Sequence, residues 1–167
     1  MANKYISLAS GQLTEIEATV TSAGAGDSGE IVALDSTGRL STTVMPVGVV
    51  PEVKSIVSSE NLTAGDLVNI YNNTGTANVR KADNSNGRKA HGFVLAGVTS
   101  PAAAIVYLEG TITGLTSLTP GAQQYLGVTG AATETAPTGT GVISQQVGTA
   151  ISATEISFEP QMTVTLA

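Results

Sequence analysis

Hydrophobic and polar residues alternate over short stretches along much of the chain. Between Glu15 and Val20 the apolar residues Ile16, Ala18 and Val20 fall on one face, which is the period of two that a half-buried strand shows. Further apolar runs of strand length occupy residues 66–71, 92–98, 104–109, 124–128, 142–143, 156–159 and 162–166. No stretch keeps helical spacing for three turns, so the pattern predicts an all-β protein.

The sequence before Pro51 differs in texture from the rest. It holds a second predicted strand at residues 30–35, after a glycine-rich break, and ends in a tail at residues 40–51 whose two prolines favour an extended connector. Two short strands bury too little to form a core. We therefore predict an extended N-terminal arm over residues 1–52, which orders against its own domain or against another chain, and a β-domain over residues 53–167.

The β-domain contains an internal repeat. The Leu-Thr-Ala-Gly at residues 62–65 recurs 56 positions later as the Leu-Thr-Pro-Gly at residues 118–121, and the same shift takes Gly92 to Gly148. A short deletion also aligns the apolar runs at residues 105–107 and 156–158. Two copies of one unit would stack and share a core, which predicts a duplicated β-sandwich or small β-barrel. Common turn chemistry at both Leu-Thr-x-Gly sites is the alternative.

Composition narrows the classes of protein that fit. Net charge is −6 with seven basic residues, which argues against nucleic-acid binding, because neutralising phosphates requires an excess of Lys and Arg. The absence of cysteine excludes disulfides and thiolate zinc sites and is typical of a protein made in a reducing cytosol. We find no pattern of a signal peptide or membrane span, so we expect a soluble protein without a membrane partner.

Motifs that suggest chemistry have simpler explanations in this sequence. Gly24 to Gly29 matches the G-x-G-x-x-G fingerprint, but a predicted strand follows it where a helix is needed. The Asp-Asn-Ser-Asn-Gly at residues 83–87 resembles a calcium loop, but its glycine is fifth where an EF-hand has it sixth. His91 is the only histidine and has no evident nucleophile partner. We therefore expect no enzymatic activity, no cofactor and no metal.

Basic residues gather in one place. Arg80, Lys81, Arg88 and Lys89 flank the turn at residues 83–87 as two legs of a predicted hairpin. On an acidic protein such a patch could dock onto an acidic partner or a neighbouring subunit. Alternatively, the charges keep a hairpin edge from aggregating.

Several segments resemble surface proteins of tailed phages. Residues 28–40, Ser-Gly-Glu-Ile-Val-Ala-Leu-Asp-Ser-Thr-Gly-Arg-Leu, followed by Met45-Pro-Val-Gly48, resemble a segment near the start of phage virion proteins. Other stretches are similar to the repeating core of capsid decoration (cement) proteins and of head or tail fibre modules, namely residues 62–71, 90–94, 115–121, 125–126 and 146–151.

The resemblance implies a structural virion protein that binds the outer surface of the capsid and cements neighbouring capsid subunits. It implies the major capsid protein as partner, a homotrimer, and a place on the capsid exterior after assembly in the host bacterial cytoplasm. We expect the partner contacts in the arm and on the basic hairpin, at Ile31, Val32, Leu34, Arg39, Leu40, Met45, Arg80, Lys81, Arg88 and Lys89.

Other functions fit the same residues less well. A fibre or baseplate adaptor would bind a host-surface glycan, but such sites present aromatic rings, and the chain has no Trp, four Tyr and two Phe. A depolymerase would need a long β-helix with paired carboxylates in a groove. A free-standing binding module with no role in a virion is the remaining alternative.

Overall fold

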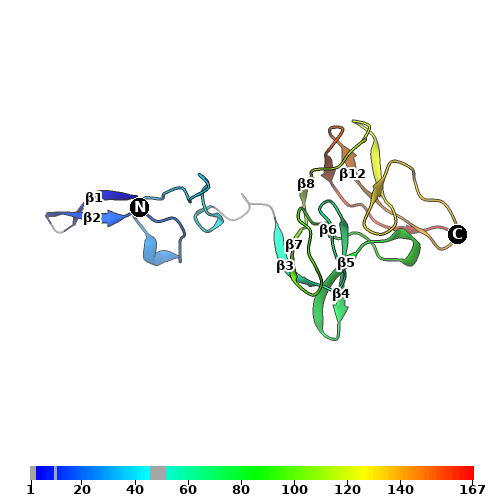
Figure 1. The fold of residues 1–167 in the computed structure, drawn as a ribbon, viewed down its shortest axis with the longest axis horizontal. Helices are drawn as coiled ribbons and strands as arrows, with labels where there is room; N and C mark the ends of the chain where they lie inside the picture. The colour runs from blue at the N-terminus through cyan, green and yellow to red at the C-terminus, as the bar shows by residue number, and fades with distance from the viewer. Residues whose placement is uncertain (1–2, 10, 46–51) are drawn as a thin grey trace. The chain divides into compact units, whose positions relative to one another are not determined.

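The computed structural model describes residues 3–9, 11–45 and 52–167. The chain divides into two compact units, Met1–Val50 and Pro51–Ala167 (Figure 1). Fourteen strands and three short 3-10 helices form in the described ranges, with no α-helix among them, which confirms the predicted all-β fold. The last part of the predicted connector, residues 46–51, lies outside the described residues.

A β-hairpin begins the first unit. Its strands β1 (Lys4–Ala9) and β2 (Gln12–Glu17) pair antiparallel, with Leu8 opposite Leu13 and Tyr5 opposite Ile16. The predicted strand over residues 15–20 is therefore right in its first half only. The hairpin is followed by the 3-10 helices η1 (Ala25–Asp27) and η2 (Thr42–Val44).

Two predictions for the first unit are wrong. Residues 30–35 form no strand, because their one pairing is a parallel bridge from Val32 to Thr19 and the Asp35 carboxylate then turns the chain by accepting the amide protons of Thr37 and Arg39. Residues 40–45 are not extended throughout, since the Ser41 hydroxyl caps η2 by accepting from the amide of Thr43.

A closed five-stranded barrel begins the second unit. Its strands follow the order β3-β5-β4-β6-β7, and an antiparallel ladder between β7 and β3 closes it. The pairing of β3 with β5 is parallel and the other pairings are antiparallel. The strands are β3 (Val53–Ser58), β4 (Leu67–Asn73), β5 (Thr76–Lys81), β6 (Gly92–Phe93) and β7 (Ala103–Tyr107). The 3-10 helix η3 (Asn84–Asn86) lies between β5 and β6.

An open five-stranded sheet follows, in the order β10-β9-β12-β13-β8. A separate two-stranded sheet joins β11 to β14. The strands are β8 (Gly110–Ile112), β9 (Gln123–Leu126), β10 (Ala132–Thr133), β11 (Ile143–Ser144), β12 (Gln146–Ala150), β13 (Ile156–Phe158) and β14 (Val164–Thr165).

The barrel and the open sheet are two copies of one arrangement. Strands β5-β4-β6-β7-β3 correspond in order to β10-β9-β12-β13-β8. Leu67 pairs with Phe93 as Gln123 pairs with Thr149, each 56 positions later. The turns agree too, since the amide of Gly65 donates to the carbonyl of Val94 as that of Gly121 donates to Ala150, both at 2.8 Å. These registers confirm the predicted duplication.

The two copies differ in closure and in one deletion. Strands β8 and β10 are three and two residues long, whereas their counterparts β3 and β5 each have six, so the second sheet is too short at its edges to close. Tyr107 faces Phe93 as Ser157 faces Thr149. Ile112 lies 56 positions after Ile56 and faces Ile156 as Ile56 faces Ala104. The predicted alignment of residues 105–107 with 156–158 therefore lies between the registers of the two ladders.

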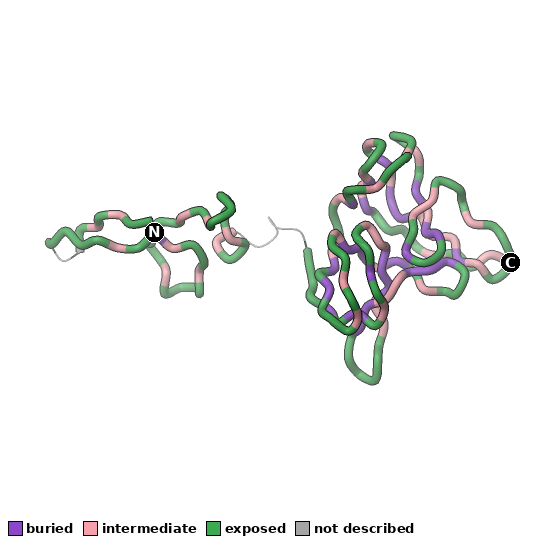
Figure 2. Tube along the Cα trace, viewed as in Figure 1, coloured by how far each residue is buried: buried purple, intermediate pink, exposed green. Residues whose placement is uncertain are grey.

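Two cores stabilise the second unit, which holds nearly all the buried positions (Figure 2). Consecutive residues of β4 contribute to different cores. Val68 packs inside the barrel, and Leu67 packs between the barrel and the open sheet. In that shared core the Phe93 ring stacks on Tyr107 and meets Phe158 edge-on, each at 5.3 Å between ring centroids. Since both copies supply side chains to it, the shared core joins them into one unit.

Candidate interaction site

The hairpin of the first unit exposes three aliphatic side chains on one face. Ile6 and Leu8 are two residues apart on β1, and Leu13 lies opposite Leu8 on β2. Between 62% and 76% of each side chain is exposed. The same face carries the ion pair of Lys4 and Glu15. We call Ile6, Leu8 and Leu13 the hairpin patch.

Four more aliphatic side chains are exposed in the second half of this unit. They are Ile31, Val32, Leu34 and Leu40, each 44–54% exposed. The backbone around Ile31 and Val32 is held in place, because the amide of Thr19 donates to the carbonyl of Ile31 and the amide of Ala33 donates to that of Thr19. All four are predicted contact residues. We call them the loop patch.

The first unit buries almost none of its described residues. Ala18 is the one residue classed as buried among those described in this unit, at 9% exposure. Arg39 is exposed, while Met45 is half-buried beside a pocket of about 390 Å³ that Val32 also lines. Seven exposed aliphatic side chains on a unit with one buried residue among those described are what a partner would cover, so we take the two patches as the candidate interaction site.

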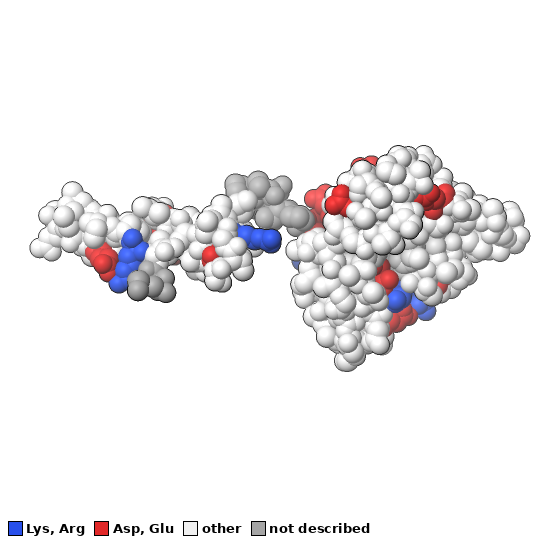
Figure 3. Space-filling model, turned by 45° about the horizontal axis from the view of Figure 1, so that its top comes forward, with Lys and Arg blue, Asp and Glu red and all other residues white. Residues whose placement is uncertain are grey.

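Within the fold, three of the four residues of the predicted basic cluster contact other side chains. Arg88 contacts Glu60 at 2.8 Å and Lys81 contacts Asp66 at 3.0 Å. The Arg80 guanidinium donates to Asn69 and lies 4.2 Å from the centroid of the Tyr71 ring. Figure 3 shows few charged side chains on the face in view. Two of the four charges, those of Lys81 and Arg88, are therefore paired with carboxylates within the fold. The predicted contact of this cluster with a partner stays a prediction.

A single antiparallel bridge closes the turn between the basic residues, and the predicted hairpin legs do not pair with each other, because Arg80 and Lys81 pair with β4. Asp83 and Arg88 exchange backbone hydrogen bonds, and Gly87 adopts a φ of 75°. The Asp83 carboxylate accepts from the amide and hydroxyl of Ser85 and from the amide of Thr129. Burial alone would raise the pKa of this carboxyl. The hydrogen bonds from Ser85 and Thr129 and the charge of Arg88 together outweigh burial, so the pKa lies below its ordinary value.

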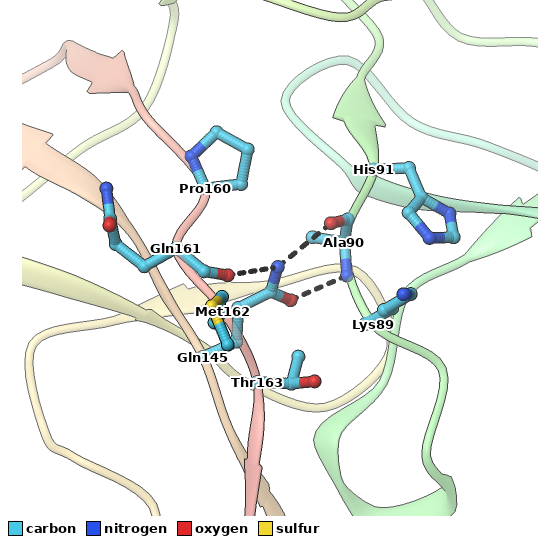
Figure 4. Close-up of a pocket in the computed structure, with 8 residues that line it drawn as sticks. All are labelled: Lys89, Ala90, His91, Gln145, Pro160, Gln161, Met162 and Thr163. Atoms are coloured by element: carbon cyan, nitrogen blue, oxygen red, sulfur yellow. Dashed lines mark hydrogen bonds between the residues drawn. The ribbon is translucent and has the colours of Figure 1, made fainter.

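Lys89 and His91 line a pocket of about 440 Å³ (Figure 4). His91 Nδ1 accepts the amide proton of Ile70 at 3.0 Å. Burial, and then the positive charge of Lys89, lower the pKa of His91. The imidazole is therefore neutral near pH 7, with its proton on Nε2.

Other candidate chemistry has no geometric basis in the described parts of the chain. No group of three or more His, Cys, Asp or Glu residues there could hold a metal ion. The Gly24 to Gly29 motif forms a 3-10 turn in which the Asp27 carboxylate accepts from the amide of Ala23. In the same ranges no helix is long and apolar enough to cross a membrane.

Comparisons with known proteins assign this chain to no family. No family model matches this chain, and searches of curated proteins and of solved structures find no significant match. The resemblance to phage surface proteins therefore remains an expectation from the sequence.

Sequence reasoning missed the hairpin patch. The signal was present, because Ile6, Leu8 and Leu13 alternate with polar residues on either side of a Ser-Gly pair, which favours a turn.

Proposed function

We propose that this chain is a structural virion protein of a tailed phage, which binds the outer surface of the capsid and cements neighbouring capsid subunits. The observation that carries the proposal is the first unit, which exposes the hairpin patch and the loop patch while burying one residue among those described. A segment of this kind gains most of its stability from the surface that covers it.

Covering the two patches would contribute several kcal/mol of favourable binding free energy. Burying a large aliphatic side chain completely is worth about 1.5–3 kcal/mol, so covering a half-exposed one is worth on the order of 1 kcal/mol. Seven such side chains together supply several kcal/mol, which must exceed the cost of ordering and association. Binding to the assembled shell alone would stabilise that shell by mass action.

The loop patch coincides with the sequence resemblance. Residues 28–40 resemble a segment of phage virion proteins, and the same stretch exposes Ile31, Val32, Leu34 and Leu40. The second unit suits a particle surface, because its closed barrel presents no free strand edge and the edge strands β10 and β8 of its open sheet are only two and three residues long, which limits unwanted pairing. In this proposal the partner is the major capsid protein, and the chain is a homotrimer on the capsid exterior, assembled in the host bacterial cytoplasm.

Sedimentation with capsids tests the proposal. Purified chain is mixed with capsids from a phage whose copy of the gene is deleted, and bound protein is measured in the pellet. We expect the wild-type chain to bind and the double variant Leu8→Asp, Leu13→Asp to bind at least about tenfold more weakly, since each charge would be buried unpaired.

Val128→Asp is the matched control, because Val128 is a similarly exposed aliphatic residue of the second unit. It should bind as the wild type does. Failure of the wild-type chain to bind any capsid would overturn the proposed function. Unchanged binding of the double variant would overturn the hairpin patch as the contact.

A further inference from the structure

A pocket lies where the barrel meets the second half of the second unit. One wall is Lys89, Ala90 and His91, and the other is Gln145 with residues 160–163 (Figure 4). Its volume of about 440 Å³ is ample for a small ion or for the end of a side chain.

A buried amide fixes the two walls relative to each other. Gln145 is 3% exposed, and its Oε1 accepts from the amide of Ala90 at 2.8 Å. Its Nε2 donates to the carbonyl of Ala90 at 3.0 Å and to that of Gln161 at 3.3 Å. The pocket is therefore preformed, and little ordering is needed when a ligand enters.

The pocket offers hydrogen-bond donors and a positive charge. His91 Nδ1 is already engaged by the amide of Ile70, so the free group of the imidazole is the Nε2–H donor. Lys89 lines the same pocket as His91 and supplies the positive charge. Thr163 adds a hydroxyl to the lining.

No acidic side chain offsets this charge. The residues that line the pocket include one lysine and no carboxylate. In the described part of the chain, Lys89 forms no ion pair, whereas its neighbours Arg88 and Lys81 do. A cation beside a neutral imidazole donor repels metal ions and attracts oxyanions.

We propose that this pocket binds an oxyanion, a carboxylate or a phosphate, held between Lys89 Nζ and His91 Nε2–H. The site is independent of the hairpin and loop patches and does not rest on the proposed function. A carboxylate would come from an acidic side chain of a partner protein, and a phosphate would come from solution.

The single histidine makes the test specific. The His91 ring nitrogens are followed by ¹⁵N NMR at constant pH 7 while sodium phosphate or sodium acetate is added, with sodium chloride at equal ionic strength as reference. We expect a saturable shift of Nε2 with at least one of the two anions. Saturation with acetate alone identifies a carboxylate site, and saturation with phosphate alone identifies a phosphate site.

Lys89→Gln should weaken the anion affinity on the order of tenfold. Lys54→Gln is the control, because Lys54 is exposed on β3 and does not line the pocket. The Lys89 side-chain ¹³Cε resonance of the wild type should shift along the same binding curve. A linear response equal to that of chloride for both anions, or an unchanged affinity in Lys89→Gln, would overturn the proposal.

Discussion

Two glycines at equivalent places in the duplicated sheets leave no room for a side chain. A Cβ at Gly92 would overlap the carbonyl oxygen of Tyr107, and one at Gly148 would overlap that of Ser157. Gly148 also adopts a φ of 153°. Both clashes are with backbone atoms, which cannot rotate away as a side chain can. The two copies therefore share a close approach of neighbouring strands as well as a turn.

We expect Gly148→Ala to lower the free energy of unfolding by about 3 kcal/mol or more, because overpacking and backbone strain add. Urea unfolding followed by circular dichroism measures the change. Gly97→Ala is the control, since its Cβ would lie 3.5 Å from the nearest atom, the carbonyl oxygen of Leu62. Equal stability of the two variants would show that the strands separate easily.

Asp83 links the two copies and makes stability depend on pH. The backbone of Asp83 closes a turn of the first copy with Arg88, and its Oδ2 accepts from the amide of Thr129 in the second copy at 3.0 Å. Its folded pKa lies below the unfolded value of about 3.9. The stability it contributes is therefore fully present above that value and is lost as pH falls through the folded pKa.

Asp83→Asn should lower the free energy of unfolding at pH 7 by about 1–3 kcal/mol, because the amide cannot accept at both positions. The difference from the wild type should shrink as the pH is lowered from about 5 toward 3. Chemical unfolding at a series of pH values gives both quantities. Glu109→Gln, at an exposed position, serves as control. A difference that does not change with pH would contradict this role for the charge.

At the scale of elements, the sequence predicts local patterns well and distant partners poorly. The shift of 56 residues identified the duplicated turns, because Leu-Thr-x-Gly is set by local backbone geometry. The glycines of β6 and β12 repeat at the same shift for a different reason, which is the close approach of a neighbouring strand. Pairing of Arg88 with Glu60, 28 residues away, left no mark on the local pattern. Residues 30–35 contain an apolar run of strand length but form only a single bridge, and a strand needs a neighbour along its length.

The shared core predicts that barrel and open sheet unfold together. Phe93 is fully buried between them against Tyr107 and Phe158. We expect Phe93→Ala to cost about 3–5 kcal/mol, with a single transition in which circular dichroism and tyrosine fluorescence coincide. Val128→Ala should change stability by less than about 0.5 kcal/mol. Two separate transitions in the wild-type chain would show that the copies fold independently.

At the scale of the whole molecule, the two units differ in how they are stabilised. The second has two cores, whereas the first exposes its aliphatic side chains. Backbone amides of residues 3–9 and 11–45 should therefore exchange with solvent far faster than those of β4 and β5 in the free chain. Hydrogen–deuterium exchange with mass spectrometry measures this. Equal protection of both units would mean that the first unit is already covered without a partner.

Cryo-electron microscopy of purified phage particles tests the central claim, that the chain binds the capsid through its first unit. We predict copies of the chain on the outer surface of the head. The first unit should contact the capsid shell, and the duplicated β-domain should lie outside the shell. Particles that lack the chain, or that carry it only on the tail, would contradict the account.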